Sequence, residues 1–500
     1  MYIDGSRNNT YEVSNMDEQN IRRTRPVRRR KKKPKWQRVL RKYWPTIRFG
    51  VIIVVFVILV IQLVSCTISG LTVNETKPAK RPQGDPTGST QVQSKEEIDA
   101  AAAQLLLDAD FIAAGYNYQK AIRMLEEFEH IRDYPEMQDR ITEYKVLDEK
   151  LVTYDRMDQI THIFFHSLIV DPSRAFDGEY TDDGYNLYMT TVDEFNAILQ
   201  QMYDRGFVLV TPHQVAKENE NGIFEYCEIR LPEGKQPFIM SQDDLNYYSY
   251  MIGTGSGMNE TPIFADTNGD GFAHRMVVGE DGYPTCEYMD ANGNVTTGDY
   301  DLVPLLEKFI QQHPDFAYHG ARAVLGMTGY EGVFGYRTKP SYETALGSEK
   351  YQQEIAAAKE VAQCLRDHGW ILASHSYGHP SYGRIKDENV AIDSDKWENT
   401  VESIIGEVDI ILYPNGSNIA GAESYKFENA KFKALYEDGY RYFFNVDSNV
   451  YWSQLGANYY RGGRRNPDGY RMWHNPEKLD DLFDVKEVYD QTRPNKAPKL

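Results

Sequence analysis

Cysteine is scarce in this sequence, with four residues in 500. Cys66 lies at the end of a long apolar run, which leaves Cys227, Cys286 and Cys364 in the rest of the chain. Three thiols can form at most one disulfide, and their odd number argues against a disulfide framework and against a cysteine-based metal site. The motif His-Glu-x-x-His is also absent, which argues against the metalloproteases that use it.

Positive charge is concentrated in one short part of the chain. The first 48 residues contain 15 Lys and Arg against 4 Asp and Glu, a net charge of +11. Because the whole chain has a net charge of −19, the remaining residues have a net charge of −30. A basic arm this dense could bind nucleic acid. The basic segment ends directly before an apolar run, however. This position indicates that residues 1–46 are a cytoplasmic tail with no nucleic-acid partner.

The apolar run covers residues 47–68 and has no charge after Arg48. A helix of this length crosses a bilayer core of about 30 Å, and Lys and Arg on its N-terminal side place that side in the cytoplasm. We therefore expect a single-pass protein of the cell membrane whose C-terminal part is extracellular. The tetrapeptide LVSC, which ends at Cys66, resembles a lipoprotein cleavage site, but the long basic segment before it favours an uncleaved signal anchor.

Two segments separate the apolar run from the rest of the chain. Residues 69–94 are rich in Pro, Gly, Ser, Thr and Gln, which predicts a flexible linker. Residues 95–153 have apolar residues at three- and four-residue intervals, which predicts two or three helices. Part of this segment resembles one tetratricopeptide unit, whereas a solenoid normally needs three. A helical stalk is therefore the simpler interpretation, and a protein partner that binds this stalk is the alternative.

Residues 154–490 alternate between short β-branched or aromatic runs and helical patterns, apart from an insertion near 250–300. This alternation predicts an α/β fold with parallel strands, either a barrel or a doubly wound sheet. In both folds the active-site residues lie at the carboxyl ends of the strands. Three polar clusters follow predicted strands: SQDDL follows PFIM, SHSYGH follows WILA, and YPNGS follows DIIL.

These clusters contain donors for a metal ion. Asp243 and Asp244 are adjacent, and two desolvated carboxylates repel one another unless a cation lies beside them. His375 and His379 are four residues apart, so one tight loop can aim both imidazoles at one point. Either pair alone is weak evidence, because exposed turns contain such pairs. Together, two imidazoles and one carboxylate form a three-ligand site that leaves room for water.

The order and spacing of the clusters resemble the polysaccharide deacetylase family, which is carbohydrate esterase family 4 with its NodB-type domain. The first family motif, Thr-Phe-Asp-Asp-Gly, is similar to SQDDL at 241–245. The second, His-Ser/Thr-x-x-His, is matched fully by HSYGH at 375–379, and the third, Arg-x-Pro-x-Gly, is matched in part by LYPNG at 412–416. The resemblance covers roughly residues 159–489.

The resemblance implies a distorted (β/α) barrel of the polysaccharide deacetylase type, preceded here by the transmembrane helix and the helical stalk. It makes Asp243 the general base and Asp244, His375 and His379 the metal ligands. The backbone N–H of Asn415 would join the metal in holding the oxyanion of the tetrahedral intermediate.

Other site residues follow from the same resemblance. His474 is the only histidine after His379 and is the candidate for the late general acid of the family. The candidates for substrate contact or for support of the site are Asp447, Tyr413, Pro414, Gly416 and His166.

The sequence departs from the family motifs at three positions. Gln242 replaces a Phe, Leu245 replaces a Gly, and Leu412 replaces the Arg that orients the base. A guanidinium could come instead from Arg464, Arg465 or Arg471, although surface charge is the ordinary explanation of each of these arginines.

The implied function is removal of N-acetyl groups from an N-acetylglucosamine-containing glycan, such as peptidoglycan or an exopolysaccharide. Asp243 would deprotonate a water molecule at the metal. Zinc is the expected cofactor, although Co²⁺, Ni²⁺ or Mn²⁺ would also suit these ligands. A glycan O-acetyl esterase is one alternative. The other is a catalytically inactive, wall-associated glycan-binding protein, which Leu245 and Leu412 favour.

Overall fold

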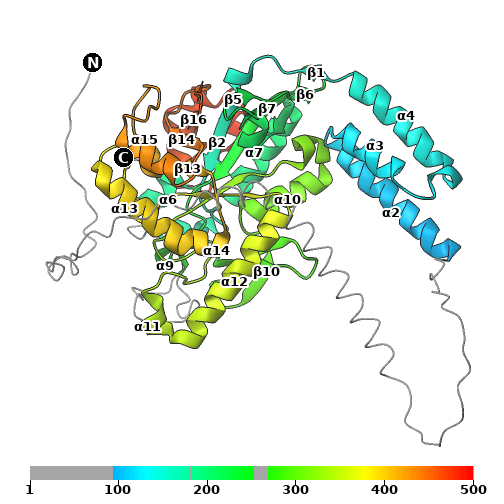
Figure 1. The fold of residues 1–500 in the computed structure, drawn as a ribbon. Coiled ribbons are helices and arrows are strands. Elements are labelled where there is room, and N and C mark those ends of the chain that lie inside the picture. The colour runs from blue at the N-terminus through cyan, green and yellow to red at the C-terminus, as the bar shows by residue number, and fades with distance from the viewer. Residues whose placement is uncertain (1–93, 179–181, 253–268, 499–500) are drawn as a thin grey trace, which may run out of the picture. The chain divides into compact units, whose positions relative to one another are not determined.

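The structure is a computed structural model that describes residues 94–178, 182–252 and 269–498 (Figure 1). The described residues belong to one compact unit, which spans Val92–Leu500. The expected cytoplasmic tail and transmembrane segment, and the linker up to its last residue, lie outside the described residues. Within the described ranges, no helix is long and apolar enough to cross a bilayer.

Three helices occupy the segment for which the periodicity predicts two or three. They are α2 (Lys95–Ala114), α3 (Tyr118–Glu126) and α4 (Pro135–Glu149). Helix α2 begins at a capping box, in which the Ser94 and Glu97 side chains each accept a hydrogen bond from the other residue's backbone N–H. The buried apolar residues of the three helices belong to a hydrophobic cluster that also includes strand residues of the α/β part.

The centre of the α/β part is a sheet of parallel strands, drawn as arrows in Figure 1. In spatial order the strands are β2 (Thr161–Phe165), β7 (Gln236–Gln242), β11 (Val324–Met327), β12 (Ile371–Ser374), β13 (Ile410–Leu412), β14 (Tyr442–Val446) and β16 (Tyr460–Arg464). Each pairs in parallel with the next. The spatial order follows the chain order, as in a barrel, whereas a doubly wound sheet reverses at a switch point.

The first and last of these strands meet at a short seam. Ile163 in β2 and Arg465, directly after β16, form an isolated parallel bridge. The Phe164 N–H donates to the Arg465 carbonyl at 3.0 Å, and the Arg465 N–H donates to the His162 carbonyl at 2.8 Å. The α/β class is therefore confirmed, and the curled sheet fits the distorted barrel rather than the doubly wound alternative.

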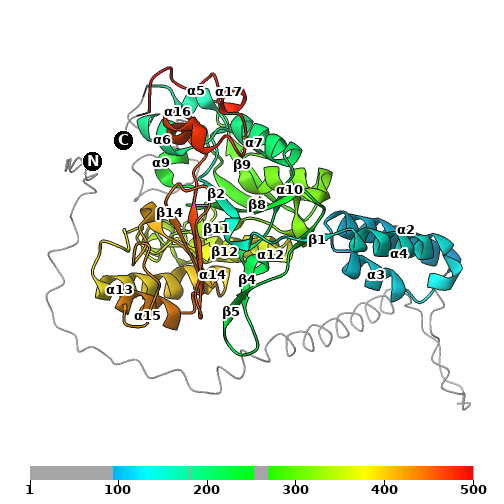
Figure 2. The ribbon, with the colours of Figure 1, turned by 90° about the horizontal axis from the view of Figure 1, so that it is seen from above.

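Helices cover the outside of the curled sheet (Figures 1 and 2). They include α7 (Val192–Asp204), α10 (Leu302–Gln312), α12 (Ser348–Asp367), α13 (Asp387–Trp397) and α15 (Ala430–Glu437). Strand β7 shows how both faces are filled: Phe238 and Met240 belong to one hydrophobic cluster, and Ile239 between them belongs to the other. Burial on both faces explains why the strand sequences are almost continuously apolar.

The insertion near 250–300 contains an antiparallel sheet of its own, made of β8 (Arg275–Val278), β9 (Pro284–Met289) and β10 (Val295–Gly298). Cys286 lies in β9, and Cys227 and Cys364 are likewise free thiols. The single disulfide that the three cysteines could form is therefore not found among the described residues.

Shorter elements complete the described chain. The strands are β1 (Val152–Thr153), β3 (Phe207–Leu209), β4 (Ala216–Glu218), β5 (Phe224–Tyr226), β6 (Arg230–Leu231) and β15 (Ser453–Leu455). The helices are α5 (Pro172–Ala175), α6 (Asp182–Tyr188), α8 (Pro212–Val215), α9 (Ser249–Ile252), α11 (Tyr342–Leu346), α14 (Ser403–Ile405), α16 (Gly469–His474) and α17 (Val485–Val488).

Candidate active site

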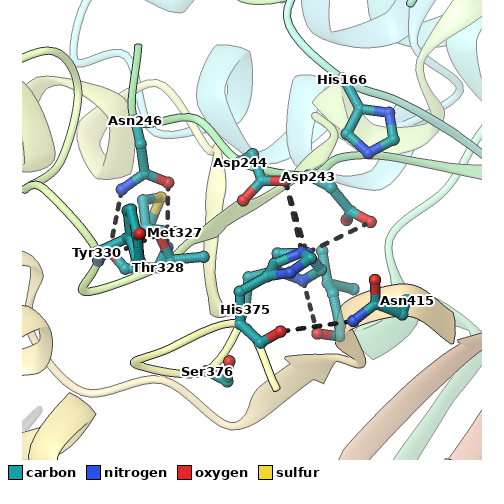
Figure 3. Close-up of polar contacts among 12 residues, drawn as sticks. His166, Asp243, Asp244, Asn246, Met327, Thr328, Tyr330, His375, Ser376 and Asn415 are labelled. Carbon is teal, nitrogen blue, oxygen red and sulfur yellow. Dashed lines mark hydrogen bonds and ion pairs between the residues drawn. The ribbon is translucent and has the colours of Figure 1, made fainter. Parts of the chain in front are cut away.

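The three polar clusters of the sequence follow three strands of the barrel. Asp243 and Asp244 come directly after β7, His375 comes directly after β12, and Asn415 lies in the turn after β13. Because the strands are parallel, their carboxyl ends open at the same end of the barrel. Figure 3 shows that the labelled side chains from these loops point toward one another.

Asp244, His375 and His379 form the candidate metal cluster. The Asp244 Oδ2 lies 3.7 Å from the His379 Nε2 and 3.9 Å from the His375 Nε2, and one ligand atom of each residue lies within 4.8 Å of the others. Ligands that bind zinc at about 2.0–2.2 Å lie on the order of 3.4 Å apart in a tetrahedral site. The donor set and its spacing therefore fit one divalent cation after a small contraction.

His375 is held with one nitrogen turned toward Asp244. It is buried, and its Nδ1 lies 2.8 Å from the backbone carbonyl oxygen of Leu412. A carbonyl oxygen can only accept, so Nδ1 carries the proton and Nε2 keeps its lone pair for a cation. The position where the family motif has Arg thus contributes a backbone carbonyl that orients a ligand.

Asp244 divides its two oxygens between different partners. The Tyr248 hydroxyl donates to the Asp244 Oδ1 at 2.6 Å, and the same hydroxyl lies 2.7 Å from the Thr328 Oγ1. Burial acts to raise the pKa of Asp244, but His379 and His375 outweigh it and hold the pKa below its usual value. The carboxylate therefore stays ionised, with its Oδ2 directed at the two imidazoles.

The backbone is strained at four site residues. The φ angles of Asp244, Ser376, His379 and Asn415 are 57°, 67°, 54° and 54°. This left-handed region is unfavourable for residues with a Cβ and persists only where the surrounding structure enforces it. Its clustering at three loops that meet indicates that packing holds the donor atoms in position.

Asp243 is paired with a buried guanidinium. Asp243 is only 3% exposed. Arg464 donates from Nη1 to the Asp243 Oδ1 at 2.6 Å and from Nη2 to the Asp243 Oδ2 at 2.9 Å. Burial acts to raise the pKa of Asp243, yet Arg464 and His375 outweigh burial and hold the pKa well below its usual range. Asp243 is therefore a fixed, ionised carboxylate, 3.9 Å from the His375 Nε2.

Two of the three candidate arginines are not surface charges, contrary to the ordinary explanation. Arg464 and Arg465 are both buried. Arg465 pairs with Asp481, with its Nη1 2.8 Å from the Asp481 Oδ1, and its Nε donates to the Thr161 Oγ1 of β2 at 3.0 Å. Arg471 contacts Ser448 and Asn475 rather than Asp243. Of the three, Arg464 is the one that holds Asp243, and it reaches this carboxylate from the last strand of the barrel.

The turn after β13 presents a backbone donor. Asn415 occupies the middle of the 3₁₀ turn Pro414–Gly416, and within the described part of the chain its N–H has no hydrogen-bond acceptor. Its Nδ2 lies 3.4 Å from the His379 carbonyl, which joins this turn to the histidine loop. Gly416 has a φ of 61°, and a Cβ there would lie 2.5 Å from the Val446 side chain. Pro414 and Gly416 therefore shape the turn.

Tyr413 does not face the site, contrary to the expectation from the sequence. Its ring is fully buried, and its hydroxyl accepts a hydrogen bond from the Tyr425 hydroxyl at 3.1 Å. It belongs to the hydrophobic cluster opposite the one that contains Leu412. Successive residues of a strand point to opposite faces, so Tyr413 packs in the core beneath the outer helices.

His474 and Asp447 have partners outside the metal cluster. The exposed His474 directs its Nε2 at the Pro498 carbonyl, 2.6 Å away, and its ring contacts the Tyr470 ring at a tilt of 38°. Asp447 accepts from the Asn449 N–H at 3.1 Å, and burial raises its pKa. No contact between either residue and Asp243 is found in the described ranges. The role of His474 as acid thus has no geometric support.

His166 lies beside the two aspartates instead. It follows β2 directly and is partly exposed, and its Nδ1 donates to the Tyr188 carbonyl at 3.1 Å. Its charge contributes to lowering the pKa of both Asp243 and Asp244. Figure 3 shows its ring next to Asp243. Among the described residues, no hydrogen bond to the His166 Nε2 is found.

Sequence reasoning missed two residues near these groups. One is Tyr248, which fixes Asp244. The other is Asp468, a buried carboxylate at the N-terminus of α16, where burial raises the pKa to about 6 and the charge of His166 acts against this rise. Neither residue belongs to a recognised motif. The only sequence signal for Tyr248 is its position four residues after Asp244.

Comparison with protein-family models gives no match, and comparison with curated proteins gives none either. Among solved structures, the Streptococcus pyogenes deacetylase PplD in complex with acetate is 13% identical, with a TM-score of 0.34, over 66% of this chain and 98% of that one. A mutant of BA3943, described as a CE4 family pseudoenzyme with restored enzymatic activity, is 11% identical, with a TM-score of 0.20, over 44% of this chain and 88% of that one. Similarity this low does not assign the chain to a family, so the functional conclusion depends on the geometry of the site.

Proposed function

We propose that this chain is a metal-dependent hydrolase that removes N-acetyl groups from an N-acetylglucosamine-containing glycan. One observation carries the proposal: two imidazoles and one carboxylate converge at the open end of the barrel, beside a second carboxylate that a buried arginine keeps ionised. A structural zinc site is usually closed by four protein ligands, whereas three ligands leave a position for water. The additional ionised carboxylate is what a hydrolytic site requires.

Asp244, His375 and His379 would hold the cation, and zinc suits one carboxylate and two imidazoles. When bound, the cation would polarise the acetamide carbonyl and lower the pKa of the attacking water, which a base as weak as Asp243 requires. Co²⁺, Ni²⁺ or Mn²⁺ could fill the same ligand set.

The residues of the chain supply the rest of the reaction. Asp243 takes the proton of the attacking water, and Arg464 keeps its carboxylate oriented for this transfer. The Asn415 N–H donates to the oxyanion that forms from the acetamide oxygen. His166 would enter this step as the imidazolium, with Nδ1 donating to the Tyr188 carbonyl. It then gives its Nε2 proton to the departing nitrogen as the carbon–nitrogen bond breaks, which leaves acetate, a free amine and a neutral His166.

We assign the substrate to the extracellular glycans because of the proposed location of the site. The basic tail and the apolar run at 47–68 support a single-pass membrane anchor with the barrel outside the cell. Peptidoglycan and exopolysaccharides are the N-acetylated polymers found there. The same site could hydrolyse a glycan O-acetyl ester, which requires the same parts.

The alternative, an inactive glycan-binding protein, rests on Leu245 and Leu412. Arg464 weakens the second of these objections, because it supplies the guanidinium that Leu412 cannot. Leu245 is fully buried, and its N–H donates to the Gly326 carbonyl at 3.0 Å, so its backbone still secures the loop of Asp244.

Acetate release tests the proposal directly. The full-length protein in detergent, supplied with Zn²⁺ and an N-acetylated chito-oligosaccharide, is expected to release acetate and expose a primary amine in equal amounts. Removal of the cation with a chelator should abolish both products, and added Zn²⁺ should restore them. An intact, zinc-loaded protein that releases no acetate from N- or O-acetylated glycans would leave the inactive binder as the better account.

Replacing His166 with Gln is expected to lower kcat for acetamide hydrolysis by about a hundredfold, because Gln cannot carry a transferable proton. Hydrolysis of 4-nitrophenyl acetate should change much less, because nitrophenolate leaves without protonation. Steady-state kinetics on both substrates measure this difference. An equal loss on the two substrates would show that His166 is structural, and the same pattern for His474→Gln would move the acid to that residue.

A further inference from the structure

Two exposed tyrosines lie next to the candidate metal cluster. Tyr250 is 49% exposed and Tyr330 is 41% exposed, although large aromatic side chains are mostly buried in this protein. Both contact the ring of Tyr248, whose hydroxyl holds Asp244. In Figure 3, Tyr330 lies beyond Thr328 on one side of Asp244, whereas Asp243 and His166 lie on the other side.

The three rings are arranged as a platform. Tyr250 stacks on Tyr248 with ring centroids 5.8 Å apart and an interplanar angle of 14°. Tyr330 meets Tyr248 edge to face, with centroids 6.0 Å apart and an angle of 88°. Tyr248 is buried, so it supports the other two rings from below. These are the geometries that aromatic pairs prefer, which gives the exposed rings defined positions.

A buried carboxylate joins the two loops that carry the platform. Glu331, adjacent to Tyr330, is 7% exposed and accepts from the Ser249 N–H at 2.7 Å and from the Ser249 hydroxyl at 2.8 Å. Arg337 approaches the same carboxylate, with its Nη1 at 3.6 Å from the Glu331 Oε2. The segment that carries Tyr250 is therefore tied to the segment that carries Tyr330, and little entropy is lost when a ligand binds there.

This arrangement matches the chemistry of a pyranose ring. The C–H face of a sugar is apolar and flat enough to stack on an aromatic ring, and tyrosine adds a hydroxyl that can meet the ring substituents. Lys339 places a cation beside the platform, with its Nζ 5.5 Å from the Tyr330 ring centroid. Exposed aromatic rings that are held in fixed positions near a candidate active site indicate a binding surface.

We propose that Tyr250 and Tyr330 form a stacking subsite for a sugar unit adjacent to the one that is deacetylated. The inference rests on the proposed function and specifies its substrate class, which is a glycan of at least two to three units rather than a free amino sugar. The Tyr248 ring separates Asp244 from both exposed rings. A sugar stacked on them is therefore a neighbour of the unit whose acetamide reaches the cluster.

Chain-length dependence tests this subsite. The full-length, zinc-loaded protein is compared with Tyr250→Ala, Tyr330→Ala and the double variant on N-acetylglucosamine, its tetramer and 4-nitrophenyl acetate. We expect kcat/KM for the tetramer to fall about tenfold in each single variant, and the values for the monomer and the ester to stay within about twofold. Tyr→Trp variants should retain the tetramer activity, and Phe111→Ala, an equally exposed aromatic of α2, is the matched control.

A binding measurement separates this subsite from the proposed reaction. Calorimetric titration of the tetramer into the parent and into the two alanine variants should show affinity that falls about tenfold in the variants. If the parent releases no acetate but shows this pattern, the hydrolase is wrong and the subsite stands. If the variants process and bind the tetramer as the parent does, or lose monomer and tetramer activity equally, the subsite is overturned.

Discussion

Replacing Asp243 with Asn is expected to lower kcat for acetate release by about 10³-fold while the protein still binds one zinc ion. The carboxylate is the proton acceptor in the proposed reaction, and an amide of the same shape cannot accept a proton. Zinc binding should persist because the ligands are Asp244, His375 and His379. Steady-state kinetics and metal analysis of the same preparation measure the two quantities.

The substitution also leaves Arg464 as a buried charge without its partner, which is expected to lower the free energy of unfolding by about 3 kcal/mol. The double variant Asp243→Asn/Arg464→Gln removes this charge and is the control. Its stability should recover while its activity stays lost. Recovery of activity in the double variant would mean that the unpaired charge, and not the missing base, had stopped catalysis.

Replacing His375 with Ala is expected to weaken zinc binding by more than about a hundredfold. Loss of a hydrogen bond that supports a ligand typically lowers metal affinity by about ten- to a hundredfold, and loss of the ligand itself should lower it further. Activity should fall with zinc occupancy. Competition against a chromophoric chelator measures the affinity. His130→Ala, which alters a histidine of the stalk segment, should bind zinc as the parent does, and parent-like affinity in His375→Ala would remove this residue from the site.

Much of the site follows from the position of residues relative to strands. Asp243, Asp244 and His375 each follow an apolar run that is a strand in the structure, and parallel strands open at one end of a barrel. Their proximity can therefore be predicted from the sequence alone. His166 follows the strand THIFF in the same way. From the sequence, His166 is accordingly among the candidates for substrate contact or support of the site, whereas the family pattern of a late histidine predicts His474 as the acid.

Other features depend on contacts that no local pattern encodes. Arg464 and Asp243 are 221 residues apart, and only the closure of the sheet between β2 and β16 brings them together. Tyr248 donates to Asp244 within a loop in which Asp244 has a φ of 57°, a backbone conformation that the sequence does not reveal. The burial of Tyr413 could have been predicted, because it follows Leu412 in an extended segment and must point to the opposite face.

The central claim is that Asp244, His375 and His379 bind one cation, and X-ray diffraction at the zinc absorption edge from crystals of the zinc-loaded protein tests it most directly. The account predicts one anomalous peak at about 2.0–2.2 Å from the Asp244 Oδ2 and from the Nε2 atoms of both histidines. The described residues contain a second group that could hold a metal ion, which consists of Asp395, Glu398 and Asp438. A peak at this second group, with none between His375 and His379, would contradict the account.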